Sequence, residues 1–296
     1  MEDFGAISLW EYTQKNSLEE DEFLDLALKA SECISRLHEL QHFHAAISAK
    51  HFLWNKDTGI LKLTDFGVCS ELVQDNVPIL STDMWDNDMM QYSSPEQTGR
   101  MNREVDYRTD LYSFGVLLYR LAVGRLPFED CSGADLMYAH IAKQPKLPHE
   151  CNANIHPTLS KIIMHLLQKS SEDRYQSAIG FKRDLLSYMS DRDNQFDVGA
   201  LDISPHFHAS KKIYGRDEQI QFILDVFDQV NSNKLSANLL LLSGYSGIGK
   251  TALINQVHKP LCRQRGNFVS GKFDQFKKNS VPYGCFIEAF RKLVKS

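Results

Sequence analysis

The amino-acid sequence predicts a multidomain α+β protein, with a mainly α-helical first part and a partial α/β second part. Before residue 190, apolar residues recur at helical spacing in several segments, and one short hairpin pattern lies among them. After residue 212, a continuous apolar run leads into a glycine-rich turn and then a helical pattern. That order is typical of a strand–turn–helix unit in an α/β domain. A chain of 296 residues is long enough for two domains.

The composition is that of an ordinary globular protein, with 43% hydrophobic and 24% charged residues. The net charge of −5 gives no electrostatic footprint for nucleic acid or an anionic membrane. No apolar run is long enough to span a membrane, and the start lacks the layout of a secretion signal. Six cysteines are scattered without C-x-x-C spacing, so we expect free thiols and a cytoplasmic location.

A long helix is predicted from Ser17 to about Leu40. Ser17 and Glu20 have the spacing of a capping box, in which each side chain bonds the other's backbone amide. The apolar residues that follow recur at intervals of four and three, which is typical of a helix with one buried face. These residues are Phe23, Ala27, Ala30, Ile34 and Leu37.

Four histidines, His38, His42, His44 and His51, lie close together in the sequence. A metal site is one interpretation, but neither a cysteine nor a carboxylate completes the set of ligands. We therefore expect His44 to lie in the core and the other three to lie at the surface.

A β-hairpin is predicted from two short β-prone runs, Phe52–Trp54 and Ile60–Leu63, which flank an Asn/Asp/Gly turn. Asp65, Phe66 and Gly67 follow the second strand. An Asp at the end of a strand and close to a flexible Gly is well placed to hold a metal ion against phosphates.

The later segments complete the first part. Glu71–Tyr92 has no periodicity and is predicted to be a loop, whereas Arg108–Val123 is apolar on most sides and predicts a buried helix. Two more helices are predicted at Leu159–Gln168 and Ala178–Met189. The polar segment from Ser190 to Lys212 is interpreted as a linker.

The first part carries a series of short motifs: Asp65-Phe66-Gly67, Ser94-Pro95-Glu96, Asp110 to Gly115, Gly124 to Phe128, and Asp173-Arg174-Tyr175. In this order they resemble the C-terminal lobe of eukaryotic-type protein kinases. The resemblance implies that Asp65 is a Mg²⁺ ligand and that Asp110 holds the backbone of the catalytic loop. It also implies that Glu96 and Arg174 form the buried ion pair of the lobe.

The segment His44–His51 corresponds to the catalytic loop but departs from the family at three positions. Ala46 replaces the catalytic Asp and cannot accept a proton, a function that contributes about 10²–10⁴ in rate. Ser48 replaces a Lys and has no charge to stabilise the transferred phosphoryl group. His51 replaces an Asn and is a poor ligand for Mg²⁺. The resemblance therefore implies that no catalytic residue is intact, and we expect this lobe to be a pseudokinase.

The second part carries a phosphate-binding motif. Asn238–Ser243 predicts a buried parallel strand, and Gly244–Thr251 matches G-x-x-x-x-G-K-[ST] before a helix predicted from Ala252 to about Cys262. In such loops the glycines let backbone amides wrap a phosphate, the lysine reaches the β- and γ-phosphates, and the hydroxyl binds Mg²⁺. The expected ligands are ATP and Mg²⁺, with contacts from Gly244, Gly247, Gly249, Lys250 and Thr251.

The order of the two parts resembles the N-terminal part of large multi-sensor (hybrid) histidine kinases. In that family a Ser/Thr-kinase-like domain and an AAA-type ATPase domain precede sensor modules. The resemblance implies a kinase-like C-lobe at residues 1–189, a linker at 190–212 and part of an ATPase domain at 213–296. A further strand is expected at Gly266–Asp274 and a helix at Gly284–Val294. It also implies a role in signal transduction, with protein partners.

The family's N-lobe residues and Walker B acid have no counterpart in this sequence, so we expect a chain truncated at both ends. The family's activity is ATP-dependent transfer to Ser or Thr, which we expect to be absent or very weak here. Two alternatives remain open. One is an active kinase when joined to a missing N-lobe, and the other is a non-functional fragment of a longer multi-sensor kinase.

Overall fold

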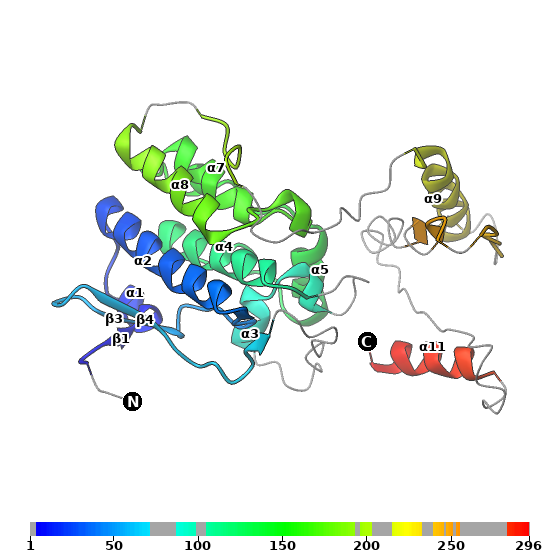
Figure 1. The fold of residues 1–296 in the computed structure, drawn as a ribbon, viewed down its shortest axis with the longest axis horizontal. Helices are drawn as coiled ribbons and strands as arrows, with labels where there is room; N and C mark the ends of the chain where they lie inside the picture. The colour runs from blue at the N-terminus through cyan, green and yellow to red at the C-terminus, as the bar shows by residue number, and fades with distance from the viewer. Residues whose placement is uncertain are drawn as a thin grey trace. The chain divides into compact units, whose positions relative to one another are not determined.

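The computed structural model describes residues 4–71, 87–98, 105–192, 196–202, 215–232, 239–245, 247–250, 253–254 and 283–295. Contacts divide the chain into two compact units, the first reaching His208 and the second taking in Ala209–Ser296. The first unit is mainly helical and contains two small antiparallel sheets. The chain is therefore a multidomain α+β protein (Figure 1).

Four helices build the core of the first unit (Figure 1): α2 (Glu20–Glu39), α4 (Arg108–Val123), α7 (Pro157–Leu166) and α8 (Ala178–Ser190). The apolar stripe predicted for the first helix is buried, except for Leu37 at its end, which is half-buried. Helix α4 has the predicted bounds and is buried on nearly every side. Burial of each large apolar side chain contributes about 1.5–3 kcal/mol, so α4 is the centre around which this unit packs.

The predicted hairpin is confirmed as β3 (Phe52–Asn55) and β4 (Ile60–Leu63), which pair antiparallel. Strand β1 (Ile7–Ser8) pairs with the other edge of β3. A second sheet forms from β2 (His42–Phe43) and β5 (Ser70–Glu71). These pairings position the loop between β2 and β3 and the loop that follows β4.

Several short helices complete the unit: α1 (Leu9–Lys15), α3 (Asn87–Tyr92), η2 (Pro95–Thr98), α5 (Gly133–Ala142), α6 (Pro148–Cys151) and η3 (Ser171–Asp173). Helix α3 corrects the prediction of a loop up to Tyr92. Its end is fixed by α4, because Tyr92 accepts hydrogen bonds from Ser113 and Arg120, at 2.7 and 2.8 Å. No helix in the described ranges is long and apolar enough to cross a membrane.

The start of α2 also differs from the prediction. The helix begins at Glu20, and Glu19 stands at its N-cap without a side-chain hydrogen bond, so the capping box of Ser17 and Glu20 is wrong. The Glu20 carboxylate instead accepts the Tyr188 hydroxyl at 2.5 Å and pairs with Arg192 at 3.1 Å. The Glu20 side chain, which the capping box would have bonded to a backbone amide, thus contacts α8 and the residues that follow α8 instead.

Part of the predicted linker is folded onto the first unit. The Asp202 carboxylate accepts the Ser177 hydroxyl at 2.7 Å and the backbone amide of the preceding residue, beside the start of α8. A Cβ atom at Gly180 would lie 2.0 Å from Asp202 Oδ1, so this approach requires glycine. The segment Phe196–Asp202 therefore belongs to the first unit, and the prediction of a linker at 190–212 is wrong over these residues.

In the second unit, the helix predicted at Gly284–Val294 is present as α11 (Gly284–Lys295), and a further helix, α9 (Asp217–Asn231), comes before the glycine-rich loop in the sequence. The predicted buried strand is wrong over Leu239–Ser243, which has no strand structure, and Leu239 and Leu241 are 79% and 86% exposed. A buried strand needs a neighbour for its backbone amides and carbonyls, and none of the described residues pairs with this run. The strand predicted at Gly266–Asp274 lies outside the described residues.

A substitution of Gly115 tests the close packing of α4 on α7. A Cβ atom at Gly115 would lie 2.7 Å from the Cβ of Leu166. We expect Gly115→Ala to destabilise the protein by about 1–3 kcal/mol, because overpacking outweighs the gain of about 1 kcal/mol in helix propensity. Urea unfolding measures this effect. Ser187→Ala on the exposed face of α8 is the control, and a higher midpoint for Gly115→Ala would contradict the packing argument.

Candidate functional site

Asp110 holds the loop that corresponds to the catalytic loop. It lies in the first turn of α4, and its carboxylate is completely buried. The carboxylate accepts the backbone amides of His44 and Ala45, both at 2.8 Å, and contacts His38 Nε2 at 3.0 Å. The structure therefore joins α4 to the loop through one charged group with three hydrogen-bonding partners.

The backbone of this loop is strained at Ala45, whose φ is +63°. A left-handed conformation costs a non-glycine residue about 1–2 kcal/mol. Asp110 binds the Ala45 amide, and the Gln97 side chain donates to the Ala45 carbonyl at 2.6 Å. These two contacts hold the strained residue from both sides.

The position of His38 corrects the expectation of a surface residue. Its side chain is buried, with Nε2 against Asp110 and the ring packed edge-on against Tyr107 at 5.3 Å. His44 lies in the core, as predicted. Burial lowers the pKa of His44, and its ring lies with Nε2 2.9 Å from the Thr64 carbonyl.

Ala46 and Ser48, the predicted replacements of the catalytic Asp and Lys, are engaged in local hydrogen bonds. The Ala46 amide lies 3.3 Å from the Nδ1 atom of His44, and its carbonyl lies 2.5 Å from the Nδ1 atom of His51. Ser48 is buried, and its hydroxyl accepts the Lys50 amide at 3.3 Å. Neither side chain carries a charge, and neither is a base that could take up a proton in catalysis.

His51 and Asp65 meet across the two loops. The Nε2 atom of His51 lies 3.2 Å from Asp65 Oδ2, and the Asp65 side chain is 65% exposed. The Asp65 backbone has a φ of +63°, a left-handed conformation that Asp tolerates better than most residues. The structure thus brings together Ala46, His51 and the one carboxylate that the sequence assigned to metal binding.

Glu96 and Arg174 form a buried, bidentate ion pair. Their two nitrogen–oxygen distances are 2.6 and 2.7 Å, and the Thr109 hydroxyl donates to the same carboxylate at 3.0 Å. Burial alone would raise the pKa of the Glu96 carboxyl, but the charge and hydrogen bonds of Arg174 outweigh it and hold that pKa below its usual value. Loss of one partner from such a pair costs about 3–5 kcal/mol.

A buried lysine beside this pair was missed by the sequence analysis. Lys169 Nζ donates to the Tyr112 hydroxyl and the Ala139 carbonyl, both at 3.2 Å. Burial, and then the charge of Arg174, lowers the pKa of Lys169 to about 7. Burial lowers the pKa of the neighbouring His140 to about 3. The only feature of the sequence that could have indicated the burial of Lys169 is its position shortly after the apolar end of α7.

The predicted phosphate-binding loop is described from Gly244 to Lys250, except for residue 246. Gly247 and Gly249 have φ values of +84° and +92°, which other residues rarely adopt, and among the described residues, chain neighbours aside, no atom lies within 4 Å of an added Cβ at either. The Lys250 ammonium donates to the carbonyls of Gly244 and Tyr245, both at 2.8 Å. The positive φ values and the space around Gly247 and Gly249 would let a phosphate group approach the backbone, and the Lys250 ammonium supplies a positive charge beside it.

A helical turn begins directly after this loop. The Leu253 amide donates to the Gly249 carbonyl at 2.9 Å, and Leu253 is buried. The start of the predicted helix is therefore present. The remainder of that helix and Thr251 lie outside the described residues.

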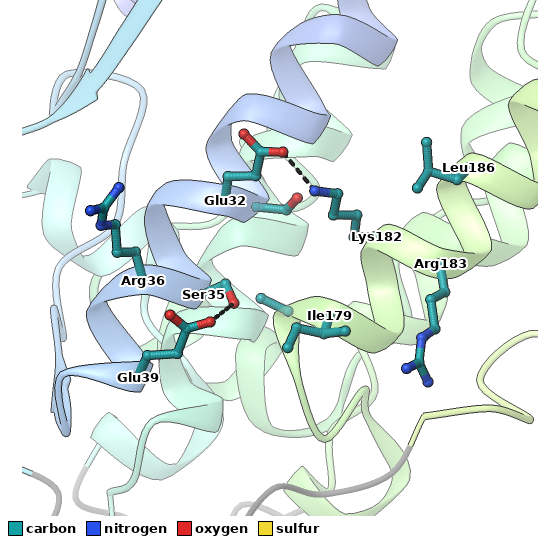
Figure 2. Close-up of a pocket in the computed structure, with 10 residues that line it drawn as sticks. Glu32, Ser35, Arg36, Glu39, Ile179, Lys182, Arg183 and Leu186 are labelled. Carbon is teal, nitrogen blue, oxygen red and sulfur yellow. Dashed lines mark hydrogen bonds and ion pairs between the residues drawn. The ribbon is translucent and has the colours of Figure 1, made fainter.

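A groove of about 640 Å³ lies between α2 and α8 (Figure 2). Glu32 and Lys182 point toward each other across it and form an ion pair at 2.6 Å. Arg36, Glu39 and Arg183 add charges of both signs to its walls. None of the predicted site residues lines this groove, so it is separate from the site around Asp65.

Comparison with known families agrees with this geometry. The family model of the protein kinase domain matches residues 1–184. The chain belongs to the protein kinase family. A second model, the AAA ATPase domain, matches residues 212–296. The kinase match covers the unit that contains Asp110 and the Glu96–Arg174 pair, and the ATPase match covers the phosphate-binding loop.

The chain spans less than a quarter of the length of each of the following relatives. The chain is 39% identical over 228 residues to hybrid signal transduction histidine kinase G of Dictyostelium discoideum. This alignment covers 69% of the chain and 6% of that protein. It is 25% identical over 326 aligned residues to histidine protein kinase 1 of Candida albicans, covering 98% of this chain and 13% of the relative. A probable serine/threonine-protein kinase of Clostridium acetobutylicum is 30% identical over 165 residues, covering 56% of this chain and 24% of that kinase. The kinase lobe therefore belongs to a signal-transduction kinase family.

Replacement of Asp110 tests the connection between α4 and the loop. Asp110→Asn keeps the shape of the side chain but removes its negative charge. One of its two acceptor oxygens becomes an NH₂ group, which cannot accept a hydrogen bond from the backbone amide that faces it. We expect the free energy of unfolding to fall by about 2–4 kcal/mol, because at least one buried backbone amide is left without a hydrogen-bond acceptor. Urea unfolding measures the loss, and hydrogen exchange should quicken at the amides of His44 and Ala45. Asp57→Asn in the exposed hairpin turn is the control. Equal stability of the two variants would contradict this role.

The pH dependence of unfolding tests the environment of Lys169. Between pH of about 7 and 10 the unfolded chain binds a proton that the folded lysine lacks, so stability rises with pH by up to about 1.4 kcal/mol per unit. We expect Lys169→Met to remove this rise, and Lys161→Met on the exposed face of α7 to keep it. Denaturation at pH 7 to 9 compares them. Parallel profiles for wild type and Lys169→Met would show that the lysine is not deprotonated by burial.

Proposed function

We propose that this chain is a signalling module in which the kinase lobe is a pseudokinase and the loop at Gly244–Thr251 binds ATP with Mg²⁺. The observation that carries the first half is the Ala46 methyl group at the position of the family's catalytic Asp. The loop around it is held by Asp110 and Gln97. A loop that is kept in place but lacks a proton acceptor supports a binding role for the lobe rather than phosphoryl transfer.

The neighbouring side chains do not supply the missing group. Asp65 faces His51 at 3.2 Å, and the Nδ1 atom of His51 is engaged by the Ala46 carbonyl. Ser48 is buried and carries no charge. A positioned base contributes about 10²–10⁴ in rate, so we infer that any remaining transfer is slower by at least this factor than in an intact kinase.

Nucleotide binding by the second unit is supported by the motif and by the described part of its loop. Lys250 would move from the loop carbonyls to the β- and γ-phosphates, and the amides from Gly244 to Gly249 would surround them. Thr251 would hold Mg²⁺, which shields the phosphate charge when bound. Gly244, Gly247, Gly249, Lys250 and Thr251 are therefore the proposed ATP contacts, and Mg²⁺ binding in the kinase lobe is weak or absent.

The proposed organisation keeps the two functional parts, residues 1–189 and 213–296, and adds the docked segment Phe196–Asp202 to the first. The names of the relatives, signal transduction and protein kinases, support protein partners in signalling. The cysteines in the described residues, Cys33, Cys69, Cys131 and Cys151, are free thiols. Free thiols support a reducing compartment, and we propose the cytoplasm.

Two assays on the full chain test the two halves separately. With labelled Mg·ATP and a general protein substrate, we expect no transfer above the level of Asp65→Ala. With a fluorescent ATP analogue, we expect Lys250→Ala to weaken binding at least tenfold (about 1.4 kcal/mol), and Lys146→Ala, an exposed lysine in the first unit, to leave it unchanged. Turnover that Asp65→Ala abolishes would overturn the pseudokinase proposal. Binding that is indifferent to Lys250→Ala would overturn the nucleotide site.

A further inference from the structure

The groove between α2 and α8 is bordered by an apolar stripe on α8. Ile179 and Leu186 line the groove, and these residues are 44% and 45% exposed. Met189 follows Leu186 by one helical turn and is 41% exposed. Residues seven and three positions apart lie on one face of a helix, so the three side chains form a stripe along α8. An exposed apolar stripe with charges beside it is typical of a surface that another protein covers.

The charged residues that line the groove differ in sign between its two helices. Helix α2 contributes two carboxylates and one guanidinium group, from Glu32, Glu39 and Arg36, whereas α8 contributes two cations, from Lys182 and Arg183. The α2 wall is therefore acidic and the α8 wall is basic. Figure 2 shows Glu39 and Arg183 on opposite walls, with the Arg183 side chain extending toward the end of the groove where Glu39 lies.

The contacts that these charges make within the chain are weak enough to be exchanged. Glu32 and Lys182 pair across the groove at 2.6 Å, but their side chains are 58% and 36% exposed. An exposed ion pair contributes about 0–1 kcal/mol, so it can change partners at little cost. Arg183 donates one hydrogen bond, to the Leu201 carbonyl at 3.2 Å, whereas a guanidinium group carries five N–H donors. Both walls can therefore pair with charges on another molecule.

We propose that this groove is the interface of a homodimer, in which α2 and α8 of one copy pack against α8 and α2 of a second copy. A twofold axis along the groove places the acidic wall of each copy opposite the basic wall of the other, and each apolar stripe is covered by the other copy's groove. Glu39 of each copy then faces Arg183 of the other.

The pairing of opposite walls is the reason to favour a second copy over an unrelated partner. A partner that carries charge of one sign would meet repulsion from one wall of the groove. A second copy supplies both signs in the required order, and two pairs of packed helices form a common bundle arrangement. The dimer involves residues of the first unit alone, so it depends neither on nucleotide binding nor on the loss of phosphoryl transfer.

Sedimentation velocity of the full chain at rising concentration tests for the dimer. We expect a monomer–dimer equilibrium, which Leu186→Ser should weaken at least tenfold (about 1.4 kcal/mol). Ile60→Ser is the control, because Ile60 is 43% exposed in the hairpin, and it should leave the equilibrium unchanged. A chain that stays monomeric up to about 100 μM would overturn the proposal, since even small specific interfaces associate at such concentrations.

Charge reversal tests whether the groove and the twofold symmetry are used. Glu39→Arg places like charges opposite each other at both contacts of the dimer, and so does Arg183→Glu. Each variant alone should therefore dimerise at least tenfold more weakly than the wild type. In an equimolar mixture, a heterodimer of the two variants pairs opposite charges at both contacts. Association of the mixture should return to the wild-type level.

The matched control is the exposed ion pair of Arg125 and Glu129, whose nitrogen–oxygen distance is 3.4 Å. Reversal of these charges by Arg125→Glu or Glu129→Arg should leave association unchanged, alone and in a mixture. A mixture of Glu39→Arg and Arg183→Glu that stays monomeric would overturn the twofold pairing, provided that circular dichroism shows both variants folded. If either variant does not fold, the comparison of Leu186→Ser with Ile60→Ser decides. A dimer that survives both charge reversals and Leu186→Ser is joined through another face and would overturn the proposal equally.

Discussion

A single buried carboxylate fixes the geometry on which the rest of the first unit depends. Asp110 stands in the first turn of the most buried helix and binds two consecutive backbone amides of the loop at His44 and Ala45. A buried charge is tolerated only when its hydrogen-bonding capacity is used, and charge-assisted bonds of this kind are about twice as strong as neutral ones. The strained backbone of Ala45 and the approach of His38 both follow from this one group.

The buried charged groups of the kinase lobe make hydrogen bonds that hold the unit together, and the side chains at the proposed sites of catalytic loss make hydrogen bonds within their own loop. Asp110 and the Glu96–Arg174 pair make complete sets of contacts. Ser48 accepts a hydrogen bond inside its own turn, and His51 bonds across it to a backbone carbonyl. Side chains that would face a substrate in an active kinase here stabilise the loop itself.

Patterns over a few neighbouring residues predicted the helices and strands that form mainly through interactions between neighbouring residues. The hairpin of β3 and β4, the bounds of α4 and the helix α11 follow from periodicity and turn residues over a few positions. Features decided by distant contacts could not be predicted in this way. Helix α3 depends on α4, and the exposure of Leu239–Ser243 depends on strands that the described residues lack. In the site, motif positions located Asp65 and Asp110, but the pairing of Asp65 with His51 and the burial of Lys169 arise only when loops and helices far apart in the sequence meet.

The docking of Phe196–Asp202 has a mechanical consequence. Among the described residues, the attachment at the end of the docked segment lies at the beginning of α8, where Asp202 bonds Ser177, rather than at the end of that helix. Tension applied to the chain beyond Asp202 is therefore borne first by the hydrogen bonds at the start of α8, next to the turn that carries Arg174. The final turn of α8 bears load only after those bonds have broken, together with the bonds of Gly199 with Asp184 and of Leu201 with Arg183 in the middle of that helix.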